Sequence, residues 1–330
     1  MSSRLARGRP LLAAAVALQL STALTAEPTK LLTGPQSTTQ WQVGRDLAQR
    51  VADPAGISLE VVTTDGPTQS LQRLRDDGSR GGGLKLVLLQ ADVAQAYLAA
   101  AERGNAEAAT YLTPMRVIAP LYEEELYFIV RSDSGLGSIQ DIQDARINVG
   151  PLEGGTALAV STLYRLLFET PIPGGKTSFL DHEEALAKLI TSRTVDVVAI
   201  LADQPTKLIA NMKPEARRFV RLLKFDASHP RSAAVLQTFS AATIRATSYP
   251  NLLAEDMPAL ASRIYLVAHG YRQGEDDELL ARLARGWCQN LPRLQAEGHA
   301  KWREVEIGLP ALKPGWQYAP PSAQEIAFCK

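Results

Sequence analysis

The residues best suited to bind a ligand lie in short polar loops. Each of these loops follows an apolar run with strand character. Each loop also precedes a segment of helical periodicity, so side-chain hydroxyls and unpaired backbone N–H groups gather at helix N-termini. In an open α/β sheet, ligands bind at this edge, beyond the carboxyl ends of the strands. The pattern therefore favours a binding site for a small polar solute. The five loops are 33–42 (TGPQSTTQWQ), 63–66 (TTDG), 90–92 (QAD), 150–156 (GPLEGGT) and 202–205 (ADQP).

Each loop residue also has a purely structural interpretation. Asp92, Thr156 and Asp203 stand one or two residues before an expected helix, where Asp or Thr caps the N-terminus and contributes about 1 kcal/mol. The glycine pair 154–155 either forms a turn or permits close backbone approach to a ligand. Trp41 is either a core residue or an apolar wall of the site. The argument for a site therefore rests on the five loops together and not on any one residue.

Catalytic and metal-binding patterns are poor in this sequence. The four histidines are scattered, and none stands at metal-ligand spacing from another histidine or a cysteine. The sequence contains no G-x-S-x-G, P-loop or G-x-G-x-x-G motif. The run Glu123-Glu124-Glu125 resembles paired carboxylates for acid–base work, but a charge run between strands is typical of a solvated turn or hinge. We therefore expect no enzyme activity, no metal and no cofactor.

Short apolar runs alternate with helical segments along most of the chain. This alternation predicts parallel β-α-β units and an α/β fold. The continuous apolar runs predict sheets that helices cover on both faces, as in doubly wound sheets. The expected strands span 57–63, 84–89, 147–150 and 195–201, and the helices that follow them span 67–75, residues from 93 onward, 157–169 and 205–212.

Two stretches interrupt the alternation. Residues 115–133 and 240–269 each contain two extended apolar runs in succession, the latter around the Tyr249-Pro250 turn. We interpret them as crossings between two α/β lobes, which would close on a ligand like a hinge. A rigid two-domain enzyme is the alternative. The expected lobe 1 comprises residues 27–122 with 248–330, and lobe 2 comprises residues 123–247.

The composition is that of an ordinary globular chain with an N-terminal export signal. The 330 residues are 45% hydrophobic and 21% charged, and 35 basic residues balance 35 acidic ones, which excludes disordered, collagenous and nucleic-acid-binding classes. Three arginines precede the apolar run 11–20, and small residues follow it. This pattern predicts a signal peptide over residues 1–26, cleaved after Ala23 or Ala26. A membrane anchor is the weaker interpretation, because the apolar run is half of the ~20 residues that span a bilayer.

Export changes the interpretation of the two cysteines, Cys288 and Cys329. In an oxidising compartment an even number of cysteines favours one disulfide, which would fasten the C-terminal tail to a late helix. Two reduced cysteines are the alternative.

An ordered set of segments resembles the TAXI family of solute receptors from TRAP transporters. The set comprises TGPQSTTQWQVG, TTDGPTQSL, LVLLQADVAQAY, VIAPLYEEELYFIVRSDSGLGSIQDIQDARINVG, GPLEGGT, VDVVAILADQPT and ATIRATSYPNLLAEDMPAL, and it covers essentially the whole chain after the signal. The resemblance implies the two-lobed fold of type II periplasmic binding proteins, with a ligand cleft between the lobes. It also implies a periplasmic, monomeric receptor that captures a small solute, such as an amino acid or carboxylate, and delivers it to TRAP membrane subunits without chemical change.

Carried over by position, the resemblance also implies a set of ligand contacts. Where the family has a glycine pair followed by two tyrosines, this chain has Ser37-Thr38 and then Gln40-Trp41, and it brings Glu153 beside the glycine pair. Glu153, Asp65, Asp92 and Asp203 place several acids around the expected site, and the five loops contain no arginine. We therefore expect a zwitterionic or neutral polar solute. The implied contacts are Ser37, Thr38, Thr39, Gln40, Trp41, Thr64, Asp65, Gly66, Gln90, Asp92, Gly154, Gly155, Thr156, Asp203 and Gln204.

Three rival functions follow from the same residues. A receptor of this kind can pass its occupancy to a sensor kinase instead of a transporter. A secreted enzyme built on the same two lobes would turn its substrate over, whereas a receptor would not. A receptor whose altered first loop no longer binds a ligand would serve in protein contacts.

Overall fold

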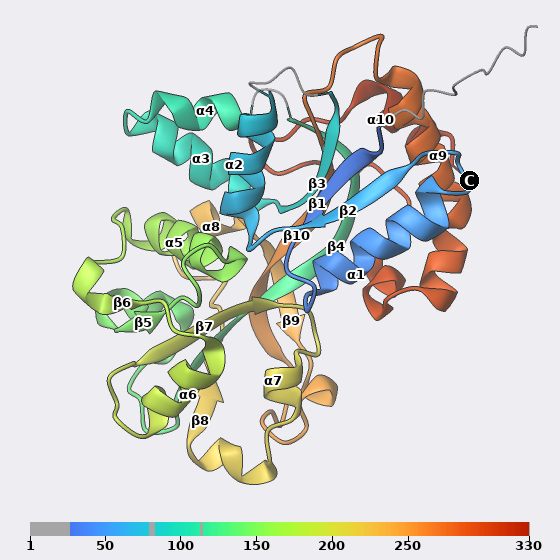
Figure 1. Cartoon of the computed structure of the whole chain (residues 1–330). Helices are drawn as coiled ribbons and strands as arrows, with labels where there is room; N and C mark the ends of the chain where they lie inside the picture. The colour runs from blue at the N-terminus through green and yellow to red at the C-terminus, as the bar shows by residue number, and fades with distance from the viewer. Residues whose placement is uncertain (1–26, 79–82, 113–114, 330) are drawn as a thin grey trace, which may run out of the picture.

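A computed structural model describes residues 27–78, 83–112 and 115–329, so the predicted signal peptide lies outside the described residues. Its strands form a mixed sheet in the order β2-β1-β3-β10-β4-β7-β5-β6, with β8 beside β4 and β9 beside β10 (Figure 1). The strands are β1 Thr29–Thr33, β2 Leu59–Thr63, β3 Lys85–Gln90, β4 Met115–Arg131, β5 Ile147–Asn148, β6 Thr177–Ser178, β7 Val197–Ala202, β8 Val220–Leu222, β9 Ser240–Ile244 and β10 Met257–His269.

The upper half of the molecule in Figure 1 is a parallel arrangement of β1, β2 and β3 with helices on both faces. Successive side chains of a strand point to opposite faces, so Leu86 and Leu88 pack toward one set of helices and Val87 and Leu89 toward the other. One face carries α1 Thr39–Leu47, α9 Asp277–Glu297 and α10 Pro320–Ala327, and the other carries α2 Pro67–Gly78, α3 Asp92–Glu102 and α4 Ala106–Leu112.

The lower half repeats this construction around the parallel strands β5, β6 and β7. On β7, Val197 and Ala199 face one core while Val198 and Ile200 face the other. The first core lies under α5 Gly155–Phe168 and α8 Ser232–Thr238, and the second under α6 His182–Ile190 and α7 Lys207–Ala210. The predicted α/β fold with helices on both faces of the sheet is confirmed.

The long antiparallel strands β4 and β10 run through both halves (Figure 1). The prediction of two separate extended runs in 115–133 is wrong, because β4 is one strand of 17 residues. Its middle carries the acidic run, so the interpretation of that run as a solvated turn is wrong as well: Glu124 and Glu125 are each only 7% exposed. The two strands expected around Tyr249-Pro250 do form, as β9 and β10.

The C-terminal tail is fastened to α9 by a disulfide between Cys288 and Cys329, whose Cα atoms lie 6.1 Å apart. This confirms the predicted bridge and excludes the reduced pair in this structure. Within the described residues, no helix has the length and apolar character needed to cross a membrane.

Candidate functional site

Polar side chains gather where β3, β10 and β4 lie side by side. Ser262 of β10 pairs with Glu124 of β4, and the side chains of Gln90 and Asp92 reach the same place from the end of β3 and the start of α3. Gln90 Nε2 donates to Glu124 Oε2 at 3.4 Å, and the Ser262 hydroxyl donates to Asp92 Oδ1. Together with the buried Tyr122, we call these five residues the strand-end cluster. All five are buried, with side chains no more than 7% exposed.

Loops from the two halves of the sheet touch beside this cluster. A β-carbon added to Gly66, after β2, would lie 2.1 Å from the carbonyl oxygen of Glu153, after β5. A β-carbon on Gly155 would lie 2.5 Å from Gln90 Nε2. The approach at position 66 meets backbone and requires glycine, whereas a side chain at position 155 would have to displace the Gln90 amide. That these glycines contact a ligand stays a prediction. We call this contact between the loops at Gly66 and Glu153 the seam.

Several polar atoms at this boundary are buried without a hydrogen-bond partner among the described residues. They are Gln90 Oε1, Asp92 Oδ2, Tyr122 Oη and Glu153 Oε2. A buried polar group that lacks a partner costs about 1–3 kcal/mol. Glu153 belongs to the lower half and the other three residues to the strand-end cluster, so a small polar molecule held between the halves could supply partners to atoms on both sides.

Burial dominates the electrostatics of the strand-end cluster. It raises the pKa of Glu124 to about 8, and the half-buried Asp203 adds to this effect while Gln90 and Lys301 oppose it. Burial also raises the pKa of Asp92 to about 6, although the hydrogen bond from Ser262 works in the other direction. Glu124 is therefore mostly protonated at neutral pH.

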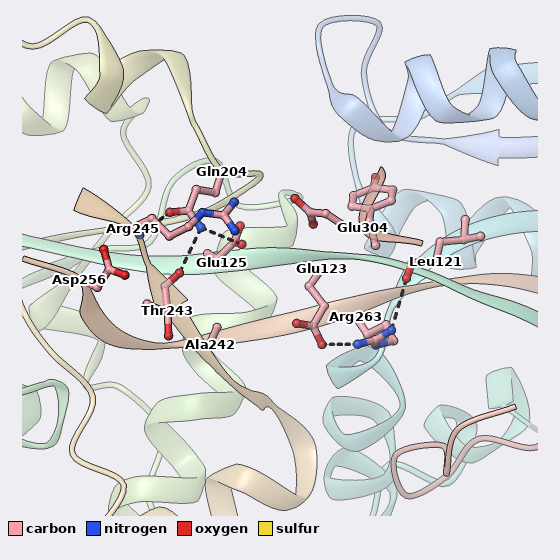
Figure 2. Close-up of a pocket in the computed structure, with 11 residues that line it drawn as sticks. Leu121, Glu123, Glu125, Gln204, Ala242, Thr243, Arg245, Asp256, Arg263 and Glu304 are labelled. Atoms are coloured by element: carbon pink, nitrogen blue, oxygen red, sulfur yellow. Dashed lines mark hydrogen bonds and ion pairs between the residues drawn. The ribbon is translucent and has the colours of Figure 1, made fainter. Parts of the chain in front are cut away.

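A cavity of about 480 Å³ opens at the crossing of β4 with β9 and β10. In Figure 2, Gln204, Arg245 and Glu125 lie on one side of it, and the Glu304 carboxylate points toward them from the other. Lys301, only 2% exposed, reaches Glu304 Oε2 at 2.8 Å and Glu125 Oε2 at 3.5 Å. The lining is Leu121, Tyr122, Glu123, Glu125, Gln204, Ala242, Thr243, Arg245, Asp256, Arg263 and Glu304.

Glu125 in this cavity is also perturbed by its surroundings. Burial raises its pKa to about 7, and Lys301 opposes the shift. Arg263 is held by Glu123 at 2.8 Å, which leaves that guanidinium less available to a solute. The cavity is therefore mixed in charge, with more acidic than basic groups.

A comparison of the chain with protein-family models decides the family. The model of the NMT1-like family matches residues 31–312. The chain belongs to the NMT1-like family. No curated protein sequence matches this NMT1-like chain.

Several solved structures of solute-binding proteins resemble this NMT1-like protein at low sequence identity. A putative periplasmic sulfonate-binding protein from Methylobacillus flagellatus is 13% identical, with 90% of this chain and 76% of that chain covered and a TM-score of 0.47. The arginine-, lysine-, histidine-binding protein ArtJ from Geobacillus stearothermophilus is 11% identical, with 88% and 99% covered and a TM-score of 0.45. A TctC solute binding protein from Polaromonas is 13% identical, with 91% and 96% covered and a TM-score of 0.44.

The NMT1-like fold brings only some of the residues implied by the resemblance to this boundary. Gly66, Gln90, Asp92 and Gly155 lie at the seam or in the strand-end cluster. Gly154 lies beside the seam, within contact distance of Gly66, and Asp203 acts on Glu124 from the end of β7. Gln204 lines the cavity and donates to Glu125 Oε1 at 3.3 Å and to the carbonyl of Thr243 at 3.1 Å.

Three predicted hydroxyl groups make hydrogen bonds within the fold. Thr38 caps α1 and donates to the carbonyl of Pro35 at 2.7 Å. Thr64 donates to the carbonyl of Thr33 at 2.8 Å, and Thr156 accepts from the backbone N–H of Leu201 at 3.0 Å. The interpretation of Thr156 as an N-cap is wrong, because Gly154 is the N-cap of α5 and Thr156 lies inside that helix. The role of the three hydroxyls toward a ligand stays a prediction.

Other predicted contacts point away from the strand-end cluster. Trp41 lines a separate hollow between α1 and β2, where the Arg45 guanidinium carbon lies 4.9 Å from its ring centre. Ser37 and Asp65 are exposed, and Asp65 accepts from Gln69 at 2.7 Å. Thr39 and Gln40 are buried in the first turn of α1.

The sequence analysis missed the acidic and aromatic residues of the long strands. Glu124, Tyr122 and Ser262 stand in the middle of β4 and β10, not in loops after strands. One signal was present: the acidic run is flanked on both sides by strand-forming residues, in LYEEELYFIV. Lys301 and Glu304, in a short 3-10 helix over Ala300–Glu304, had no signal in the sequence.

Proposed function

We propose that this NMT1-like protein is a periplasmic solute-binding receptor that captures a small polar solute between two lobes and releases it unchanged. One observation carries the proposal: four buried polar atoms without partners belong to residues on the two sides of the boundary between the halves of the molecule. An enzyme would need a reacting group positioned against a substrate, whereas these atoms need only a molecule that satisfies them. Capture by burial between lobes accounts for them most simply.

The proposed lobes are residues 27–122 with 248–330, and residues 123–247. The parallel strands β1–β3 belong to the first and β5–β7 to the second, and β4 and β10 connect them. A solute that contacts both sides favours the closed arrangement by its difference in affinity between open and closed forms. Closure would thus report occupancy to a partner.

We further propose that the partner is the membrane part of a TRAP-type transporter, which imports the solute with an ion gradient. The TAXI-like sequence segments support this choice, and the closed seam offers a surface that exists only when the lobes meet. Genes for TRAP membrane subunits next to the gene for this protein would support transport. A sensor-kinase gene in that place would favour signalling instead.

A thermal-shift screen of amino acids, amines, dicarboxylates and sugars tests the receptor. A ligand at a hundred times its Kd adds about 2.7 kcal/mol to the free energy of unfolding, which raises the melting temperature measurably. We expect one chemical class to raise it, and mass spectrometry to recover the ligand unchanged. The Gln90→Ala variant should lose the response, whereas Gln72→Ala, on the exposed side of α2, should keep it. A converted product, or no stabilising compound in any class, would contradict the proposal.

A further inference from the structure

The unmet hydrogen-bonding capacity at the boundary is almost entirely acceptor capacity. Gln90 Oε1, Asp92 Oδ2 and Glu153 Oε2 accept hydrogen bonds when the carboxyl groups are ionised, and only the Tyr122 hydroxyl can also donate. Gln90 is 4% exposed, and its Nε2 already donates to Glu124, so its free oxygen lies within the cluster. Apart from the Tyr122 hydroxyl and the proton that Glu124 holds at neutral pH, the site lacks donors, and a solute that fits it must supply them.

The charged groups around Glu124 likewise include few that could donate a hydrogen bond to a solute. Its charged neighbours are Asp203 and Glu125, which are acidic, and Lys301. The Lys301 ammonium is already engaged by Glu304 at 2.8 Å and by Glu125 at 3.5 Å. Among these neighbours there is accordingly no free cation that could hold an anionic solute in the strand-end cluster.

We propose that the solute carries an ammonium group without needing a carboxylate, and that this group binds among Gln90, Asp92 and Glu124. An ammonium has three N–H donors and one positive charge, which matches the unpartnered oxygens of Gln90 and Asp92 and the carboxyl group of Glu124 that lies beside them. The inference rests on the proposed receptor function and narrows its ligand to a cationic amine. It departs from the zwitterionic or neutral solute expected from sequence.

Binding of an ammonium should displace a proton from Glu124. The free carboxyl holds its proton up to a pKa of about 8, because of burial and Asp203, whereas an ammonium beside it favours the charged form. The groups that face Glu124 are Asp203, Gln90, Lys301, Glu125 and the buried Tyr122. At pH 7 the release should approach about one proton, and the affinity for the amine should rise with pH up to about pH 8.

Isothermal titration calorimetry tests this with matched probes. The cations are 1,4-diaminobutane, agmatine and ethanolamine, and the anions are succinate, glutarate and glycolate. We expect at least one amine to bind and the anions not to bind. Phosphate and Tris have different ionisation enthalpies, so titrations in the two buffers at pH 7 give the number of protons released. We expect about one proton per amine bound.

Variants separate the role of Glu124 from a general effect of charge. Glu124→Gln keeps the shape but removes the carboxylate, so amine affinity should fall by at least about tenfold and proton release should vanish. The control is Glu60→Gln, on the exposed edge strand β2, separated from β4 by three strands, and it should bind as the wild type does. Melting curves confirm that both variants fold, and Asp92→Asn provides a second test if Glu124→Gln does not.

The outcomes also distinguish this inference from the function on which it rests. Binding of succinate or glutarate but of no amine would be consistent with the receptor function and would contradict the proposed ammonium-bearing solute. Equal amine affinity in the wild type and Glu124→Gln would overturn it too. Failure of every probe here and of every compound in the wider thermal-shift screen would overturn the receptor itself.

Discussion

The carboxyl group of Glu124 should link the stability of the ligand-free protein to pH. It titrates near its ordinary value of 4.5 in the unfolded chain and near 8 in the folded one, so the folded state holds more protons between these values. Its contribution to the free energy of unfolding is therefore full below pH 4.5 and is lost as pH rises toward 8. The glutamine in Glu124→Gln does not titrate. The melting temperature of this variant minus that of the wild type should therefore increase from pH 5 to pH 8.

Calorimetry of both proteins at pH 5, 6, 7 and 8 without ligand measures this difference. Other titrating groups, such as His269, whose pKa burial lowers to about 4, are common to both proteins and cancel in the comparison. Parallel curves for the two proteins would show that Glu124 titrates alike in the folded and unfolded states.

Residue types predicted the place of some site residues but not their partners. Asp92 was expected to cap α3 but is the first residue of that helix, after the N-cap Ala91, and its side chain accepts from Ser262, which is 170 positions away in the chain. The resemblance implies that the hydroxyls of Thr38, Thr64 and Thr156 contact a ligand, but such groups equally satisfy backbone atoms of the fold. Local sequence predicts that a helix begins near Asp92 but not the contact that its side chain makes across the sheet.

The two loops that meet at the seam should be sensitive to a single methyl group. Alanine at position 66 would place its β-carbon 2.1 Å from the Glu153 carbonyl oxygen, so Gly66→Ala should hold the lobes apart. We expect weaker ligand binding and a larger radius of gyration than in the wild type, measured by small-angle X-ray scattering.

Gly56→Ala is the matched control for that variant. Gly56 also has a positive φ, of 67°, but nothing lies within 4 Å of an added β-carbon. It should lose about 1–2 kcal/mol of stability from backbone strain and keep the radius of gyration of the wild type. A Gly66→Ala protein as compact and as tight a binder as the wild type would show that the seam does not control closure.

Elements with regular periodicity were predictable, and the element that carries the cluster was not. The apolar alternation of 84–89 and the helical stripe after 93 appear as β3 and α3 nearly as expected. The strand β4 was divided in the prediction because three consecutive acids are rare in a buried strand. Their burial depends on Gln90, Lys301 and Gln204, which come from distant elements.

The whole molecule combines a predictable class with contacts that no local pattern contains. Alternating strands and helices indicate an α/β fold, and two interruptions indicate where the chain passes between halves. The seam joins Gly66 to Glu153, and the cavity joins Glu304 to the opposite half, so both depend on how the halves meet. The expected lobe boundaries at 122/123 and 247/248 stay a prediction.

The sharing of β4 and β10 between the halves predicts that the protein unfolds as one unit. Tyr127 and Ile129 of β4 lie in one lower core, Phe128 in the other, and Ile118 in the upper core, so neither half keeps its core if these strands leave. All four tryptophans, at 41, 287, 302 and 316, belong to the upper half, so their fluorescence reports that half alone. Far-ultraviolet circular dichroism reports both halves. Melting curves from the two methods should coincide within error, as two-state unfolding requires, whereas a dichroism transition that precedes the fluorescence change would show that the lower half melts independently.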